Sequence, residues 1–169
     1  MIKITIPKNN IAERKYILDI IFDEFLGLDF KVLESDDCQD WEIELENGSK
    51  IIFEDHFFNK YLKELEYLKL ENIPAKVEFV KNQFIVEDDI PIIYGNKKLE
   101  TKNDELKTIF CGIDIFASCF FMLTRWEEYV NKNRDSHDRF SATESLAFKQ
   151  GFLDRPIVNE YVEMLKNML

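Results

Sequence analysis

The chain has 169 residues, of which 46% are apolar and 33% are charged, and this composition predicts a single soluble globular domain. Its formal net charge of −11 argues against nucleic acids and anionic membranes as partners, because like charges repel one another. The longest apolar run is too short and too interrupted to span a bilayer, and the first residues lack the apolar core of a signal peptide. We therefore expect a cytoplasmic protein without a membrane span.

The N-terminal region predicts a strand, a helix and a second strand. Residues 2–6 alternate and are rich in β-branched side chains, which is typical of a strand. Residues 9–27 have the apolar spacing of a helix, which we expect Asn10 to cap and Gly27 to end. Residues 30–34 predict a short strand. A helix with so wide an apolar face must pack on another element, and a sheet is the expected partner.

The clearest local pattern is a β-hairpin within residues 41–55. Asn47 and Gly48 lie between two strand-like segments, and this pair is a preferred sequence of the two-residue type I′ turn. With that turn, Ile43 should face Ile52 across the two strands.

The middle of the chain predicts one more helix and a second hairpin. Residues 57–70 have apolar side chains at helical spacing, and residues 76–88 have the pattern of a hairpin. Residues 90–96 indicate a short buried strand that Gly95 helps to end. The charged run 97–107 is expected to be a polar connection.

The C-terminal part predicts a strand, a long helix, a charged loop and a final helix. Residues 108–111 favour a buried strand, and the long helix should run from about residue 113 to Asn131. A charged loop should follow as far as about Arg155. The last helix should begin near Pro156, with Asp154 as its cap.

Strands and helices interleave along the chain, which predicts an α/β fold of the α+β kind. We expect a single domain over residues 1–169, with a mixed sheet, hairpins and about four helices. The three cysteines do not predict a disulfide framework, because their number is odd and no C-x-x-C occurs. Buried free thiols are the expected state of Cys38, Cys111 and Cys119.

A polar stripe lies along the otherwise apolar helix predicted for residues 113–130. On a helical wheel, Asp114, Ser118, Arg125 and Glu128 fall on one side of this helix. An arginine buried there needs a partner, because an unpaired buried charge costs several kcal/mol. Glu128 is one candidate partner, and acids of the following loop are others.

Two interpretations of the stripe are open: an internal ion-pair network, which we favour, and a ligand pocket lined by Arg125, Trp126 and His137. Catalytic motifs are missing from the sequence. His56 and His137 lie far apart and in no metal-binding spacing, and no serine has a nucleophile motif around it. We therefore expect no metal, no cofactor and no catalytic residue, and hence a chain that is not an enzyme.

Four pieces of the C-terminal sequence match a known family: DIFASCFFMLTRWEEY, DSHDRF, ESLAF and GFLDRPIVNEY. They resemble the uncharacterised N-terminal domain found ahead of the catalytic domain in a group of bacterial polysaccharide deacetylase family proteins. In those relatives the loop often reads His-Gly-Arg-Phe, whereas Asp138 takes the glycine position here. The metal site of the deacetylases uses an Asp-Asp pair followed later by an H-x-x-x-H spacing, and no such set occurs in this chain.

The resemblance implies the front part of a longer polypeptide, whose C-terminal domain removes acetyl groups from an amino-sugar polymer in bacterial glycan metabolism. The leading hypothesis is a non-catalytic accessory domain that packs on or regulates this deacetylase-like domain. One alternative is a carbohydrate-binding module in which Trp41 and Trp126 stack on a glycan, and another is a metal-dependent hydrolase built from scattered acids. The expected ligand or interdomain surface comprises Asp114, Arg125, Trp126, Glu127, Glu128, His137, Asp138 and Arg139.

Overall fold

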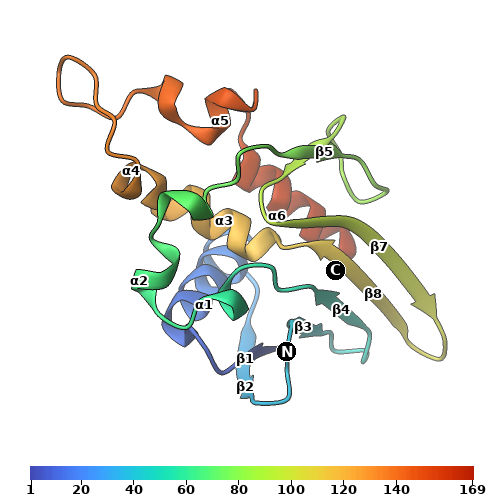
Figure 1. Ribbon diagram of the computed structural model, residues 1–169. Helices are drawn as coiled ribbons and strands as arrows, with labels where there is room; N and C mark the ends of the chain where they lie inside the picture. The colour runs from blue at the N-terminus through green and yellow to red at the C-terminus, as the bar shows by residue number, and fades with distance from the viewer.

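A six-stranded mixed sheet forms the base of the protein in the computed structural model, which describes residues 1–169 (Figure 1). The strands lie in the order β2-β1-β3-β4-β8-β7, and a separate pair, β5-β6, forms a second small sheet. Their bounds are β1 (Ile2–Pro7), β2 (Phe30–Ser35), β3 (Trp41–Glu44), β4 (Lys50–Phe53), β5 (Glu78–Val80), β6 (Ile90–Ile92), β7 (Gly95–Asn103) and β8 (Lys107–Ile113).

Two pairs of neighbouring strands are parallel, β1 with β2 and β4 with β8, and the other neighbours are antiparallel. The first parallel pair is joined by a helix. The second is joined by a long excursion through short turns, the small sheet and β7. The fold is therefore a single α+β domain with a mixed sheet, as the alternation of elements predicts.

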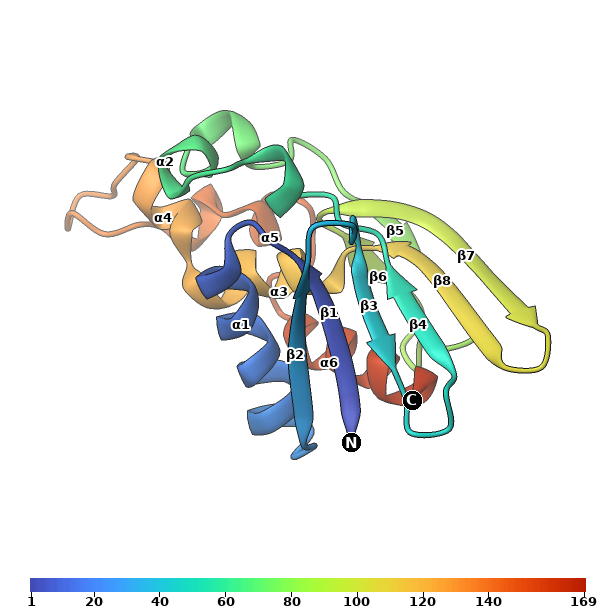
Figure 2. The same cartoon turned by 90° about the horizontal axis from the view of Figure 1, so that it is seen from below.

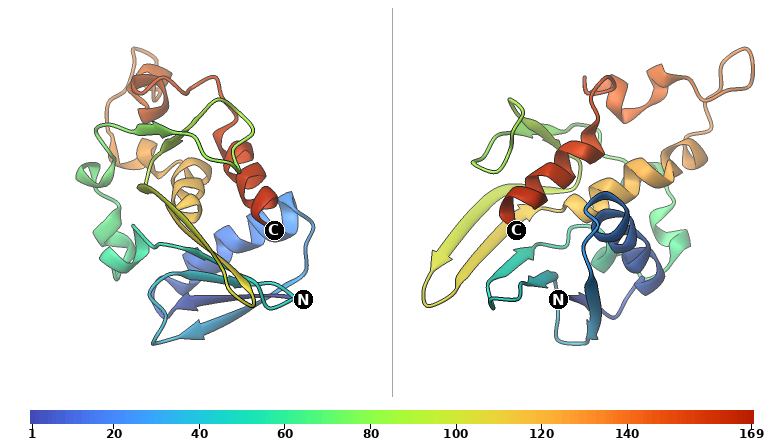
Figure 3. Two further views of the ribbon diagram at one scale, coloured as in Figure 1. Left: turned by 90° about the vertical axis from the view of Figure 1, so that its right-hand side faces the viewer. Right: turned by 180° about the vertical axis from the view of Figure 1, so that it is seen from behind.

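The longest helices cover one face of the main sheet, and the other face is open to solvent (Figures 2 and 3). α1 (Ile11–Leu18), whose axis continues as a π-helix over Asp19–Phe25, lies on that face together with α3 (Ile115–Thr124) and α6 (Ile157–Met168). The remaining helices are short: α2 (Glu64–Tyr67), α4 (Trp126–Val130) and α5 (Leu146–Lys149).

The core lies between this sheet face and the three longer helices. Strand residues alternate between the core and the open face, as expected for a sheet that is covered on one side only. Phe116 of α3 is at the centre, with its ring centroid 4.7 Å from that of Trp41 and 5.2 Å from that of Phe53. All three cysteines are buried and free, as predicted.

The first helical segment ends just before Gly27, as predicted, and Asn10 occupies the N-cap position, but its side chain does not cap the helix. Asn10 has a φ of 45°, and its side chain makes no hydrogen bond to the helix. Its carboxamide instead donates to the carbonyl oxygens of Phe58, at 3.0 Å, and Tyr61. A tertiary contact has thus replaced the local cap.

The hairpin at Asn47-Gly48 forms, but its register differs by one residue from the prediction. Ile43 pairs with Ile51 rather than with Ile52. The amide of Leu45 donates to Ser49, so the loop holds three residues, and Gly48 at φ 87° closes it. A three-residue loop with glycine in the left-handed region is the next most common hairpin connection, and it shifts the pairing.

The long helix predicted over residues 57–70 is wrong, because only short turns and α2 form there. Leu62 and Leu65, two of its predicted apolar contacts, are 69% and 81% exposed. Side-chain amides take the carbonyl groups that a continuous helix would use. Asn10 binds two of them, and Asn72 donates to the carbonyls of Glu66 and Tyr67, both at 3.0 Å.

The predicted hairpin within residues 76–88 is also wrong, because β5 pairs with β6 across a longer loop. The run 97–107, predicted as a polar connection, forms most of β7 and the turn into β8. β7 is the outermost strand, so it has a neighbour on one side only. An edge strand of this kind does not require an apolar alternation, which is why the pattern did not reveal it.

The long helix predicted for residues 113–131 breaks at Arg125, whose φ is 55°. α3 ends there, and α4 leaves in another direction. The predicted polar stripe therefore does not exist on one continuous helix. α6 begins after Pro156, as expected, but the predicted cap Asp154 makes no hydrogen bond to its first turn.

Candidate functional site

Arg125 and Glu128 form the ion pair that the sequence predicted, at 2.5 Å between Arg125 Nη2 and Glu128 Oε1. The predicted burial is wrong, because 71% of the Arg125 side chain is exposed. The break between α3 and α4 turns this side chain away from the apolar face of α3. An exposed pair of this kind contributes little to stability, about 0–1 kcal/mol.

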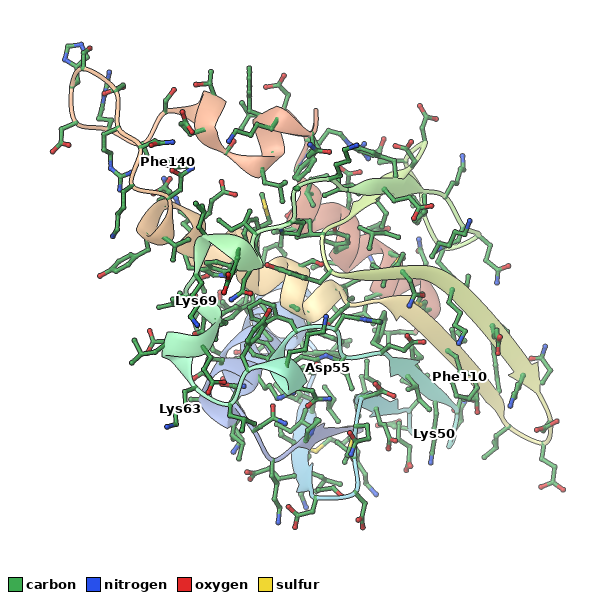
Figure 4. The ribbon with its side chains drawn as sticks, viewed as in Figure 1. Lys50, Asp55, Lys63, Lys69, Phe110 and Phe140 are labelled. Atoms are coloured by element: carbon green, nitrogen blue, oxygen red, sulfur yellow. The ribbon has the colours of Figure 1, made fainter.

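His137, Asp138 and Arg139 lie in an exposed loop that projects from the domain above α4 (Figures 1 and 4). The carboxylate of Asp135 closes this loop by accepting the amides of His137, at 2.8 Å, and Arg139, at 3.0 Å. Asp138 has a φ of 59°, in the region that favours glycine. Its backbone therefore has the conformation that suits the glycine of the resembling loops. None of these three residues lines any of the five main cavities.

Trp126 and Glu127, at the start of α4, are buried and 4% and 8% exposed. The two oxygens of the Glu127 carboxylate both accept the amide of Leu146, at 3.1 Å, and so hold the first residue of α5. The indole nitrogen of Trp126 is buried without a hydrogen-bond partner. Glu127 thus connects α4 to α5, whereas Trp126 packs against Phe121 of α3.

An aromatic groove of about 370 Å³ lies between α2 and the α3–α4 junction. Its exposed side is formed by Tyr129, which is 73% exposed, and α2 also bears the 81% exposed Leu65. The groove is lined by Glu64, Tyr67, Leu68, Phe120, Thr124, Trp126 and Tyr129.

A charged hollow of about 540 Å³ adjoins this groove and shares Thr124 and Tyr129 with it. Its other lining residues are Arg125, Glu128, Lys132 and Arg134. We call the groove and the hollow together the α4 face. Of the predicted surface, only Arg125, Trp126 and Glu128 belong to this face. Asp114, Glu127 and the loop residues lie elsewhere.

A buried ion pair between Arg14 and Asp55 was not predicted. Arg14 Nη1 lies 2.7 Å from Asp55 Oδ2, and both side chains are fully buried. The guanidinium also lies 4.7 Å from the ring centroid of Trp41 and donates to the carbonyl of Asn9. In Figure 4 the labelled Lys63 and Lys69 lie at the outer side of α2, whereas the side chain of Asp55 is fully buried. Arg14 lies on the buried face of α1, three and four residues before Ile17 and Leu18, so a charged residue on the apolar side of the helix was the one sequence signal for this pair.

Asp114 is the one predicted site residue that belongs to this interior network. It follows β8, and its carboxylate accepts the amides of His56, at 2.8 Å, and Ala117, at 3.0 Å, so it caps α3. Burial, followed by the nearby Asp55 carboxylate, raises the pKa of Asp114 to about 8. The two amides and Arg14 oppose this shift only in part.

We expect the contribution of Asp114 to stability to decline as the pH rises from about 4 to 8, between the pKa of the unfolded and the folded chain, because a carboxyl with a raised pKa stabilises the fold only while it is protonated. The slope for one proton is at most about 1.4 kcal/mol per pH unit. In Asp114→Asn the group stays neutral. The difference in unfolding free energy between wild type and variant, measured by urea unfolding, should therefore shrink across this range. A difference that is constant with pH would contradict the assignment.

A second polar cluster, also unpredicted, lies at the end of β4. Glu54 Oε1 is 3.0 Å from His56 Nε2 and accepts the carboxamide of Asn96 at 3.2 Å. A bulge in β7 places Asn96 there. Gly112 leaves room for it, since a Cβ at that position would lie 1.8 Å from Asn96 Oδ1. The carboxylate fixes the imidazole, but none of the five main cavities is lined by these residues.

No group of three or more histidine, cysteine, aspartate or glutamate side chains is placed so that it could hold a metal ion. The helices of the protein are also too short or too polar for any of them to cross a membrane.

These features define a small α+β domain with a mixed sheet, one covered sheet face and a groove beside its shortest helices. The chain matches the family of unknown function DUF7033 over residues 2–169, and it belongs to that family. No curated protein and no solved structure matches the chain.

Proposed function

We propose that the chain is a non-catalytic accessory domain that packs through the α4 face against a second domain of the same polypeptide. The proposed partner is a polysaccharide deacetylase-like domain, which the accessory domain positions or regulates in bacterial glycan metabolism. The identity of this partner rests on the resemblance of the C-terminal sequence. The α4 face is the structural observation that supports a docking role.

The α4 face has the composition of a protein interface. Tyrosine, tryptophan and arginine are enriched at such interfaces, and large exposed apolar side chains are concentrated where a partner binds. Here Tyr129 lines the groove and is 73% exposed. Arg125 and Lys132 in the adjoining hollow add positive charge on a chain of net charge −11. This face therefore offers an apolar anchor site next to a basic rim.

The alternative of a carbohydrate-binding module receives less support from the geometry. Trp41 is fully buried in the core, and Trp126 is 4% exposed, so neither ring is available as an open platform for a sugar. Of the aromatic side chains that line the groove, Tyr129 is the one with a largely exposed ring. The groove therefore suits an inserted apolar side chain of a protein partner better than a sugar ring stacked on an aromatic ring.

The docking proposal predicts that Tyr129→Ala weakens the contact with the partner domain by about 1–2 kcal/mol or more, as expected for an aromatic anchor. The coding sequence after residue 169 first shows whether a deacetylase-like domain follows. Calorimetric titration of residues 1–169 with that domain then measures the affinity. Amide hydrogen exchange of the joined polypeptide should show added protection in α4 and in residues 61–70.

Val86→Ala is the matched control, because Val86 is also apolar and 68% exposed but does not line the α4 face. It should leave the affinity unchanged. A partner domain that protects other segments, or the absence of any deacetylase-like domain after residue 169, would overturn the proposal.

A further inference from the structure

A separate cavity of about 400 Å³ lies between residues 70–75 and the segment that includes α4 and α5. One wall is apolar and comprises Leu70, Ile73, Pro74 and Ala75. The opposite wall is mainly polar and includes Glu127, Glu144 and Lys149. This volume falls within the usual range for small-ligand sites, about 300–1,000 Å³.

Glu127 is the buried charge of this cavity. Its side chain lines the cavity although the residue is only 8% exposed. Both carboxylate oxygens accept the same amide, that of Leu146, at 3.1 Å, and Glu127 forms no ion pair. The only lysine in the wall, Lys149, is paired with Glu144 at 3.7 Å. An ionised carboxylate has about four acceptor positions, so Glu127 can accept further hydrogen bonds from a cation.

The apolar wall of the cavity is held in place by hydrogen bonds from Gln150. The Gln150 carboxamide donates to the carbonyl of Ala75 at 3.2 Å and accepts the amide of Val77 at 3.1 Å. These two bonds tie the 70–75 segment to the end of α5. The distance between the apolar wall and Glu127 is therefore set by the protein itself, as in a preformed site.

We propose that this cavity binds a primary ammonium or guanidinium group attached to an apolar stem. The cation would pair with the carboxylate of Glu127, and the stem would lie on the wall formed by Ile73 and Pro74. A buried carboxylate without a counter-ion favours a cation, and the two carboxylates against one lysine disfavour an anion. This site is distinct from the α4 face, so its test does not depend on the docking proposal.

The first test uses n-pentylamine and agmatine as probes, with 1-pentanol as the neutral control. We expect saturable binding of both cations by calorimetry or by NMR shifts of residues around the cavity. The alcohol should bind at least tenfold more weakly. Glu127→Gln keeps an acceptor for Leu146 and should lower the affinity for the cations at least tenfold, which corresponds to about 1.4 kcal/mol. Glu105→Gln, in the exposed turn between β7 and β8, should change nothing.

A second variant keeps the test decisive if Glu127→Gln folds poorly. Lys149→Met removes the wall cation, so it should strengthen the binding of both cations. Equal binding of amine and alcohol, no saturable binding of either cation, or unchanged affinity in both variants would overturn the proposal.

A further pair of probes distinguishes a lysine side chain of a polypeptide from a small-molecule amine as the natural ligand. The affinity of a peptide with blocked ends and one lysine is compared with that of the same peptide carrying acetyl-lysine. Tighter binding of the lysine peptide than of n-pentylamine would assign the site to a polypeptide side chain. Binding of the free amines alone would assign it to a small molecule.

Discussion

Arg14→Met is expected to lower the free energy of unfolding by about 3–5 kcal/mol, the usual cost of removing one partner of a buried ion pair. The variant leaves the carboxylate of Asp55 buried without its cation, and Asp114 lies close enough to raise the repulsion further. Loss of the contact with the Trp41 ring adds to the effect. Urea unfolding near neutral pH measures the change.

Two further variants show how much of this loss of stability comes from the unpaired buried carboxylate of Asp55. In Arg14→Met with Asp55→Asn, the uncompensated charge is gone, and the amide oxygen can still accept the backbone amides that Asp55 Oδ1 binds, so much of the stability should return. Arg125→Ala removes an exposed pair and should cost no more than about 1 kcal/mol. Similar losses for Arg14→Met and Arg125→Ala would show that the buried pair has no special role.

Gly95→Ala is expected to destabilise the protein by more than about 3 kcal/mol, beyond the usual range of backbone strain alone. Gly95 has a φ of 120°, which side chains rarely adopt. A Cβ there would lie 2.2 Å from the carbonyl oxygen of Gly112 and 2.8 Å from the amide nitrogen of Asp114. Both are backbone atoms, so β7 and β8 would have to separate at the point where Asp114 begins α3. Thermal and urea unfolding measure the loss.

Gly27→Ala is the matched control, because Gly27 has a φ of 64° but nothing lies within 4 Å of its added Cβ. Its cost should be limited to the left-handed conformation, about 1–2 kcal/mol. If both alanine variants lost the same stability, the close approach of β7 to β8 would not matter energetically.

The elements that could be predicted from the sequence are those whose local pattern agrees with their surroundings. α6 forms as its apolar line predicts, with Ile157, Tyr161 and Leu165 buried. β1, β2 and the hairpin of β3 and β4 also form. The hairpin register was missed because Asn47-Gly48 suits loops of two lengths. The alternation of the strands favours the observed register, in which the buried Trp41 and Ile43 lie opposite Phe53 and Ile51.

The predictions that were wrong depend on contacts between distant residues. The helix predicted for residues 57–70 competes with hydrogen bonds from Asn10, which a local pattern does not reveal. The break at Arg125 separates two helical segments whose spacing looks continuous on a wheel. Of the predicted surface, Arg125 and Glu128 do form a pair, but Asp114 and Glu127 belong to two other networks.

The edge strand β7 has a consequence for self-association. The outer edge of a sheet presents unpaired backbone groups on which a strand of another molecule can add, and this is a common route to aggregation. β7 carries Lys97, Lys98 and Lys102 along this edge. A second copy that paired its own β7 there would bring these lysines together and strip them of water. The strand therefore discourages edge-to-edge growth of the sheet while it completes the fold.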